Sequence, residues 1–446
     1  MKANVESRTG NQVTMMVEIE APELNKALDK AYQKLVKTVN IRGFRKGRVP
    51  RTVLEHYLGK GALLSEALED MFPSIYSSAV SETGIKPVDT PNVEIQDLTE
   101  GGPVKLKVEV TVEPEVLLGE YKGLAVEKTV MLIDEKTVDQ TLEQLREQQA
   151  QLVEPERDTV QQGDLVTIDY TGYVDGQAFP NGAATDVELE IGSGRFIPGF
   201  EEALVGAPQG DEIEINVTFP ADYGSTELAG KDAVFKVTVH EIKEKVYPEL
   251  NDEFAKDVSS CDTLADLRAE IRGNLEKQAQ ETAEDNLRND LINLAVRNAT
   301  IDVPEAMIKT EMDELTRDFE QRLAYQGLKL DVYLQAYNIS REQFDGDVRA
   351  QAEQRVRTSL VLNAIAEKEG ITVTSEEVDE RIEQIAAGAG ERADQVRSAY
   401  GRDSMRRGLE ENLRLEKVVN LLADSALITV KETDAASEAE HEENAE

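Results

Sequence analysis

Residues 191–200 read Ile-Gly-Ser-Gly-Arg-Phe-Ile-Pro-Gly-Phe, and this stretch decides the fold of the segment around it. Its three glycines and one proline favour turns, and its two phenylalanines supply large apolar rings. The surrounding segment 160–243 holds 8 of the chain's 22 aromatic residues in 84 of 446 positions. This excess predicts a compact β domain with an aromatic-lined pocket. Glycines separate its short β-rich runs, at 164–171, 186–191, 212–219 and 233–242.

Other motifs stand in a definite order around that stretch. They are Asp169-Tyr170-Thr171-Gly172 at the end of a strand, Gly176-Gln177-Ala178-Phe179 after a turn, and Phe219-Pro220-Ala221-Asp222-Tyr223-Gly224 before a last strand through Phe235. Together these motifs resemble FKBP-type peptidyl-prolyl isomerases across essentially the whole segment. The resemblance implies a half-barrel of antiparallel strands around one short helix near residues 199–204.

The resemblance also implies a proline pocket that needs no cofactor and no metal. Phe200 would occupy its floor, where many relatives carry tryptophan, and Tyr223 would offer a phenolic donor to the substrate backbone. Many relatives carry an acid directly after the residue matching Phe179. Pro180-Asn181 stands there in this chain, a departure that bears on turnover and sequence preference. By position, the catalytic pocket would contain Tyr170, Phe179, Phe196, Ile197, Phe200, Tyr223 and Phe235, with Leu189 and Leu228 as weaker members.

The expected chemistry is rotation about an X-Pro bond, which takes tens to hundreds of seconds without a catalyst. An apolar pocket favours the twisted, less conjugated amide, and this is stabilisation of a transition state by differential binding. The alternative is that the aromatic residues only fill a β core. Residues 192–195, Gly-Ser-Gly-Arg, lack the G-x-x-x-x-G-K-[ST] arrangement of a phosphate loop, so we interpret them as a turn.

A second notable stretch, residues 42–51, reads Arg-Gly-Phe-Arg-Lys-Gly-Arg-Val-Pro-Arg and places five cations in ten residues. The chain as a whole has a formal net charge of −39. Residues 1–60 hold 12 Lys/Arg and 6 Asp/Glu, a net of +6, which leaves −45 for the other 386 residues. This split predicts a basic docking end on an acidic body, and a polyanion such as nucleic acid would attract only the docking end.

The residue types of this basic loop suit docking. Two glycines relax the backbone at the tip, Phe44 can insert into an apolar niche, and Arg45, Lys46 and Arg48 can contact RNA phosphates or acidic groups. Arg42 and Arg51 are expected to widen the positive field. The alternative is a solvated basic surface loop without a partner.

Residues 1–113 are predicted to form one small α+β domain that presents the basic loop between helices. Strands are expected at 13–20, 92–98 and 104–112, with helices after Ala21-Pro22 and over about 61–83. Residues 114–133 look like extended connecting chain, and a helix capped by Asp134 is expected through about 151.

From about residue 248 the pattern is almost wholly helical, and the stretch 262–299 would reach ~57 Å as one helix. The tail 432–446 carries seven acids without Lys or Arg and is predicted to be disordered. The apolar stripes are typical of core, with client-binding surface as the alternative reading. Their members are Ile308, Met312, Leu315, Phe319 and Leu323, then Val356, Leu360 and Ile365, then Met405, Leu409, Leu413 and Leu422.

The basic loop closely matches the ribosome-binding signature of the bacterial trigger factor family, and the order of domains matches too. The resemblance covers nearly the entire chain. It implies that ribosome-binding residues are Gly43, Phe44, Arg45, Lys46, Gly47, Arg48 and Pro50. The implied fold is α+β multidomain: a ribosome-binding domain at 1–113, a linker and helical arm at 114–150, an FKBP-type domain at 151–246, a discontinuous helical chaperone body at 247–431 and an acidic tail at 432–446.

The function implied by this resemblance is a ribosome-associated chaperone. It would bind nascent chains at the tunnel exit, contacting ribosomal protein and rRNA, delay misfolding and isomerise X-Pro bonds. A homodimer away from the ribosome and links to protein export and cell division are also implied. Two alternatives stay open: a stand-alone prolyl isomerase with targeting domains, and an rRNA-binding assembly factor.

The remaining composition argues for a reducing cytoplasm and no membrane. Cys261 is the only cysteine, so no intrachain disulfide is possible. No run approaches the ~18 apolar residues of a membrane span, and the start lacks the apolar stretch of a secretory signal. His56, His240 and His441 are distant from Cys261 in sequence, so we expect an unreactive thiol and no zinc site.

Overall fold

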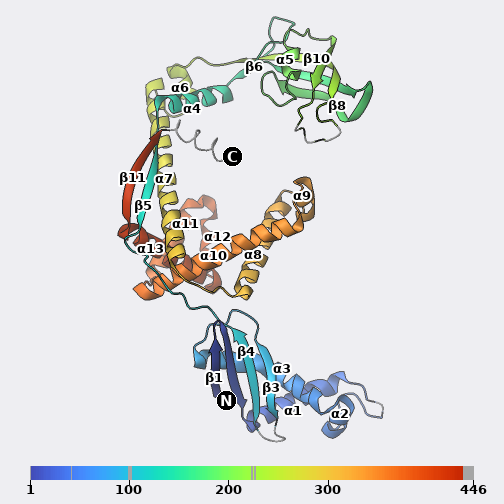
Figure 1. Cartoon of the computed structure of the whole chain (residues 1–446), viewed down its shortest axis with the longest axis vertical. Coiled ribbons are helices and arrows are strands. Elements are labelled where there is room, and N and C mark those ends of the chain that lie inside the picture. Colours follow the sequence, from blue (N-terminus) through green and yellow to red (C-terminus); the bar gives the residue numbers. More distant parts are fainter. Residues whose placement is uncertain are drawn as a thin grey trace. The chain divides into compact units, whose positions relative to one another are not determined.

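The structure is a computed structural model that describes residues 2–41, 43–98, 103–221, 223, 225 and 228–434 (Figure 1). The chain divides into two compact units. Unit 1 contains Met1–Lys128 and Glu284–Val430, and unit 2 contains Thr129–Ala283 and Lys431–Glu446. Within the described ranges, no helix is both long enough and apolar enough to cross a membrane.

Unit 1 begins with a four-stranded antiparallel sheet. Its strands lie in the order β1 (Lys2–Thr9), β2 (Gln12–Ile19), β4 (Val104–Thr111) and β3 (Asn92–Leu98). Buried residues alternate with more exposed ones along β2 and β4, so one face of the sheet is apolar. Helices α1 (Ala21–Thr38) and α3 (Lys60–Thr83) pack on this face and complete the core.

The predicted strands and helices of residues 1–113 are confirmed, including the end of α3 at Gly84, which has a left-handed φ of 68°. β1 and the short helix α2 (Arg51–Leu58) were not predicted from the sequence. β1 lies at an edge of the sheet and contributes only Ala3 to the buried core, so its apolar alternation is weak. α2 has eight residues, too few to show a clear helical period.

Unit 1 also contains most of the helical body. The last part of α7 (Leu264–Asn298) shares one apolar core with α10 (Arg341–Glu369) and α13 (Asp403–Ser425). Residues 121–126, which precede the helices in sequence by more than a hundred positions, contribute Tyr121, Leu124 and Val126 to this core. α7 is one helix of 35 residues, roughly 52 Å long, which confirms the predicted long helix.

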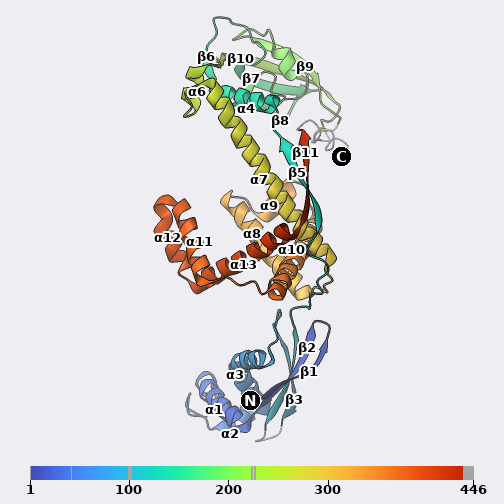
Figure 2. The same cartoon turned by 90° about the vertical axis from the view of Figure 1, so that its left-hand side faces the viewer.

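Two further groups of helices extend the body. α8 (Glu305–Tyr325) packs along α10, and α9 (Leu330–Ala336) lies where they join (Figures 1 and 2). α11 (Ser375–Gly388) packs against α12 (Ala393–Tyr400) after the 3-10 turn Gly390–Arg392 (Figure 2). The predicted stripes are buried or half-buried except at Met405, which is 45% exposed. Most of these residues therefore form core.

Two strands lie where the sequence analysis expected other structure. β5 (Ala125–Leu132) falls in the segment predicted as connecting chain, and it pairs with β11 (Leu427–Asp434). Residues 427–434 therefore form a strand and not a helix, and residues 432–434 belong to this strand and not to a tail. Residues 435–446 of the predicted disordered tail lie outside the described residues.

Unit 2 contains an antiparallel β domain. Its helix α5 (Phe200–Leu204) buries Phe200 and Leu204 against the sheet. This arrangement confirms the predicted half-barrel around one short helix. The strand order is β6 (Gln151–Val153), β10 (Asp232–Val246), β7 (Leu165–Val174) and β8 (Gln177–Glu190), and β9 (Glu212–Thr218) also pairs with β10.

The helices of unit 2 form a smaller core of their own. α4 (Glu135–Gln148) begins after Asp134, whose carboxylate accepts a 2.8 Å hydrogen bond from the Thr137 amide, as predicted for a helix cap. α6 (Asp252–Val258) begins after the cap Asn251. Apolar side chains of α4 and α6 pack with those of the first part of α7.

Candidate functional site

The β domain of unit 2 contains a cavity of about 460 Å³. This volume lies in the range typical of ligand pockets in proteins. β7, β8, β10 and the loops before α5 and after β9 supply its walls. The lining is almost wholly aromatic or apolar: Tyr170, Phe179, Gly182, Arg195, Phe196, Ile197, Pro198, Phe219, Pro220, Tyr223 and Phe235.

The aromatic rings fix one another in place. Phe196 stacks on Phe200 with 4.7 Å between ring centroids, and Phe200 meets Phe235 edge-on at 5.3 Å. Phe200 is fully buried, so it lies beneath the lining and supports Phe196 from below. Phe200 is therefore not among the residues that line the cavity, which corrects its assignment to the catalytic pocket. Such interlocked rings give a pocket whose shape is set before a ligand binds.

Two glycines let the strands approach the ring of Phe179. A Cβ atom added to Gly172 would lie 2.6 Å from that ring, and one added to Gly182 would lie 2.4 Å from it. Contacts this short do not occur for real Cβ atoms, and neither glycine has a positive φ. Space for the ring, and not backbone freedom, therefore requires glycine at both positions.

The structure brings most of the predicted pocket residues together. Leu189 is fully buried in the β core, and Leu228 is half-buried against that core. Neither lines the cavity, which corrects their assignment to the pocket. The side chains of Pro180 and Asn181 are not among those described. The predicted residues that do line it are Tyr170, Phe179, Phe196, Ile197, Tyr223 and Phe235.

Several residues line the cavity without having been predicted, and Phe219 is the largest of them. Its ring lies 4.8 Å from Tyr223 and 5.9 Å from Phe179, between centroids, and so closes one side of the cavity. Phe219 begins a motif that the sequence analysis had already singled out, so a signal was present. Pro198, Pro220, Gly182 and Arg195 also line the cavity without having been predicted.

A buried carboxylate holds the turn before α5. Glu201 is 4% exposed, and its carboxylate accepts hydrogen bonds from the backbone N–H groups of Gly192 (2.8 Å), Gly194 (3.0 Å) and Phe196 (3.1 Å). Burial raises the pKa of Glu201, but these donors outweigh burial and the net pKa lies below its usual value. The amides that a phosphate would need are occupied, which confirms that this stretch is a structural turn.

Replacing Glu201 by glutamine is expected to destabilise the β domain by about 2–3 kcal/mol at pH 7, because a buried charge-assisted hydrogen-bond network is lost. A carboxyl whose folded pKa is lowered stabilises the fold above its unfolded pKa. That contribution disappears as the pH falls through the folded pKa. The Glu201→Gln variant should therefore lose less stability than the wild type between pH 7 and pH 3.

Chemical denaturation at several pH values measures this difference, and hydrogen exchange at the Gly192 and Gly194 amides reports the turn itself. Asp211→Asn removes an exposed acid from the same domain and is the matched control. If Glu201→Gln and Asp211→Asn behaved alike at every pH, the carboxylate would not be holding the turn.

The basic loop between α1 and α2 forms a second candidate site. All its predicted binding residues are exposed, and Phe44 has 40% of its surface accessible although it is large and apolar. No described residue forms an ion pair with Arg45, Lys46 or Arg48, so these cations are available to a partner. Arg42 lies outside the described residues.

Buried residues fix the base of the basic loop. Ile41 and Val49 enter the small core that also contains Val36 and Leu54. The Tyr32 hydroxyl donates a 2.6 Å hydrogen bond to the carbonyl oxygen of Val49. The exposed tip is therefore carried between two anchored ends.

Both glycines of the loop have backbone angles that glycine adopts readily. Gly43 has a φ of 98° and Gly47 a φ of 83°. The Gly47 amide donates a 3.0 Å hydrogen bond to the carbonyl oxygen of Val36, which turns the tip back toward α1. These angles explain why glycine occurs on either side of Arg45 and Lys46.

Arg51 does not behave as the sequence analysis expected. Its Nη1 lies 3.0 Å from Asp29 Oδ1, and its Nε lies 2.8 Å from Glu55 Oε1. Two acids thus offset its positive charge, and Arg51 does not widen the positive field of the loop. Arg45, Lys46 and Arg48 still supply positive charge at the tip of the loop.

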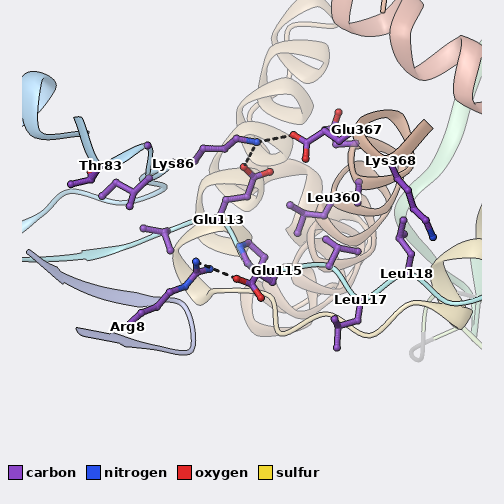
Figure 3. Close-up of a pocket in the computed structure, with 17 residues that line it drawn as sticks. Arg8, Thr83, Lys86, Glu113, Glu115, Leu117, Leu118, Leu360, Glu367 and Lys368 are labelled. Carbon is purple, nitrogen blue, oxygen red and sulfur yellow. Dashed lines mark hydrogen bonds and ion pairs between the residues drawn. The ribbon is translucent and has the colours of Figure 1, made fainter. Parts of the chain in front are cut away.

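A larger cavity of about 880 Å³ lies within unit 1 (Figure 3). Lys86 Nζ lies 3.2 Å from Glu113 Oε2 and 2.9 Å from Glu367 Oε1, and Figure 3 shows Lys86 directed at both carboxylates. Leu117 and Leu360 add apolar surface to the same lining. Unlike the aromatic cavity, this one offers mixed charged and aliphatic contacts.

One group of side chains in the described ranges has donor atoms close enough to hold a metal ion. The donors of Asp169, Asp186 and His240 lie within 4.8 Å of one another. His240 Nε2 is 2.8 Å from Asp169 Oδ2, and this contact raises the pKa of His240 and lowers that of Asp169. Asp169 and Tyr170 are consecutive on β7 and point to opposite faces, so the group lies away from the aromatic cavity. The contact joins neighbouring strands, and it is an ion pair when His240 is protonated.

Cys261 has the environment of an unreactive thiol. Its Sγ donates a hydrogen bond to Glu270 Oε2 at 2.8 Å, and this acidic neighbour raises the pKa of Cys261. A raised pKa leaves little thiolate at neutral pH, and thiolate is the reactive form.

Three family models match the chain in sequence order. The bacterial trigger factor protein model matches residues 1–145, the FKBP-type peptidyl-prolyl cis-trans isomerase model matches 156–240, and the trigger factor C-terminus model matches 263–424. The matches include both candidate sites.

Comparison with whole proteins also finds similarity to trigger factors. A trigger factor of Halalkalibacterium halodurans is 43% identical over 95% of this chain and 99% of its own length. A trigger factor of Bacillus cereus is 44% identical over 96% of this chain and 100% of its own. A solved structure described under "Promiscuous Substrate Recognition in Folding and Assembly Activities of the Trigger Factor Chaperone" has a TM-score of 0.53 at 26% identity, over 95% of this chain and 99% of its own.

Proposed function

The chain belongs to the trigger factor family of ribosome-associated chaperones, and from this premise we propose that its basic loop docks on the ribosome while its aromatic cavity isomerises X-Pro bonds of emerging chains. One observation supports two separate sites: the three tip cations that form no ion pair with a described residue lie in unit 1, and the aromatic cavity lies in unit 2. Each site therefore has its own chemistry and its own test.

Docking would use the exposed tip of the basic loop. Arg45, Lys46 and Arg48 would pair with rRNA phosphates or with acidic groups of a ribosomal protein at the tunnel exit. Phe44 would bury its exposed ring in an apolar niche of that partner. The acidic remainder of the chain would be repelled by RNA, so attachment would be confined to the tip.

Isomerisation would occur in the aromatic cavity without a covalent step. The proline ring would pack among Tyr170, Phe196 and Phe235 and would displace water from these apolar walls. A twisted amide has a less polar carbonyl, so it loses less solvation there than the planar amide does. The Tyr223 hydroxyl hydrogen-bonds to none of the described residues and would donate to the substrate backbone.

Phe196→Ala is expected to lower kcat/KM for prolyl isomerisation at least about tenfold, because a wall of the cavity that stacks on Phe200 is removed. The measurement is the refolding rate of a protein whose slow step is X-Pro isomerisation, with the full chain as catalyst. Tyr173→Ala, which removes a ring of β7 that does not line the cavity, is the control. Equal rates for Phe196→Ala and the wild type would remove the catalytic role of the cavity.

Nascent chains would contact surfaces of unit 1. Around α9 the side chains of Tyr325 (84%), Val332 (51%) and Tyr337 (67%) are exposed, and a client would bury apolar groups against them. The mixed cavity around Lys86 would accept segments that carry both charged and aliphatic side chains. Broad, weakly specific surface of this kind suits a chaperone that holds many sequences.

The two alternatives are not favoured. A stand-alone isomerase would not need family matches on both sides of the β domain. An rRNA-binding assembly factor would need further basic or aromatic surface for RNA, and the acidic composition argues against it. We further propose a cytoplasmic location and a homodimer away from the ribosome, both of which follow from the family.

A further inference from the structure

Arg195 is the only charged side chain that lines the aromatic cavity in the described part of the chain. It is exposed, and it directly precedes the lining residue Phe196. Its backbone belongs to the turn that the buried Glu201 carboxylate holds, so the side chain starts from a fixed point. A cation is therefore placed at the rim of the site where the proline would bind.

The positive charge of Arg195 is not offset within the described part of the chain. Many other basic side chains of this acidic protein, which carries 88 Asp and Glu against 49 Lys and Arg, do pair with a carboxylate. Arg157 pairs with Asp164 at 2.6 Å, and Arg397 pairs with Glu383 at 2.8 Å. No described residue forms an ion pair with Arg195.

Among the residues that the structure describes, the cavity lining holds no carboxylate to neutralise this charge. The two residues that follow Phe179 in sequence, Pro180 and Asn181, are uncharged as well. The charge that the described lining residues carry is thus opposite in sign to that of the chain as a whole.

We propose that Arg195 sets the substrate preference of the isomerase site, so that it favours X-Pro segments with an Asp or Glu within two residues of the proline. The inference rests on the proposed isomerase function and names its substrate class. Guanidinium binds a carboxylate through two parallel hydrogen bonds, which fixes the peptide as well as attracting it. An extended peptide advances about 3.3 Å per residue, so only acids close to the proline come within reach.

The same charge explains how an acidic chaperone handles acidic clients. A net charge of −39 repels an acidic segment from most of the molecule. A single cation beside the cavity offsets that repulsion where the chemistry takes place. The preference should amount to about twofold to fivefold in kcat/KM, the effect of one solvent-exposed ion pair. It should also shrink as salt screens the pair.

The test uses the full chain and short peptides in which Glu, Gln or Lys is placed in turn at each of the two positions before and after the proline. The wild type should isomerise the Glu peptide faster than the Gln peptide, and the Gln peptide faster than the Lys peptide, at one or more of these positions. Arg195→Gln should make the three peptides equal there. Arg195→Glu should reverse their order.

Lys231→Gln removes the same charge from an exposed position of the same domain that does not line the cavity, so it separates a local effect from one of net charge. The preference should survive in this variant. A Glu-to-Gln ratio that is unchanged in Arg195→Gln, or that falls equally in Lys231→Gln, would overturn the inference. Failure of the wild type to isomerise any peptide would instead refute the proposed activity itself.

Discussion

Changing Phe44, Arg45 and Lys46 together to alanine is expected to reduce binding to ribosomes at least about tenfold. The loss combines the apolar contact of a ring that is now 40% exposed with two cations that pair with no described residue. Burying a phenylalanine side chain contributes about 1.5–3 kcal/mol, and about 1.4 kcal/mol already corresponds to a tenfold change in affinity. Co-sedimentation with purified ribosomes measures the change directly.

The matched control for this variant keeps the basic loop and alters its surroundings. Changing Lys26, Lys30 and Tyr57 to alanine also removes two cations and one exposed aromatic ring from the same domain. We expect this variant to bind ribosomes nearly as well as the wild type. If both triple variants lost binding equally, net charge and not the loop would be responsible.

Phe200→Ala is expected to destabilise the β domain by about 3–5 kcal/mol, because a fully buried ring leaves a cavity that its neighbours cannot fill. The ring of Phe200 contacts the rings of Phe196 and Phe235, and its centroid lies 6.2 Å from that of Tyr170. Removing the ring would therefore take away the support of these three lining residues. A loss of this size is a large fraction of the stability of a typical domain. Isomerase activity should disappear, mainly through unfolding.

The same variant separates the two activities of the chain. Suppression of aggregation of an unfolded client should survive in Phe200→Ala, because the exposed surfaces proposed for clients lie in unit 1. Phe200→Leu keeps more of the side-chain volume and should retain more stability and more isomerase activity. Loss of aggregation suppression together with isomerase activity would favour a stand-alone isomerase.

Much of the fold could be predicted because local patterns carried it. Each of three features could be recognised from residues close together in sequence. They are the motifs of the β domain with their glycines, the alternating strands of residues 1–113, and the long helical stretch of α7. β5 and β11 were missed for the opposite reason. Their pairing joins residues about three hundred positions apart, and neither strand is buried well enough to alternate clearly.

The candidate sites, too, could be predicted only in part from the sequence. The sequence identified the aromatic rings of the cavity, but an apolar residue in a pocket wall and one in the core look alike in sequence. Leu189 was therefore assigned to the pocket although it is fully buried in the core, and Phe219 was left out although it closes one side of the cavity. Arg51 illustrates the same point for charge, since its two acidic partners are known only once α1 and α2 are folded.

Ribosome binding by the full chain at a series of salt concentrations tests the central claim most directly, which is that this acidic protein is attached through a small cationic tip. The account predicts clear co-sedimentation at low ionic strength and a steady loss of binding as salt rises, with a shallower dependence for the Phe44, Arg45 and Lys46 alanine variant. Absence of binding at low ionic strength, or binding that salt does not weaken, would contradict it.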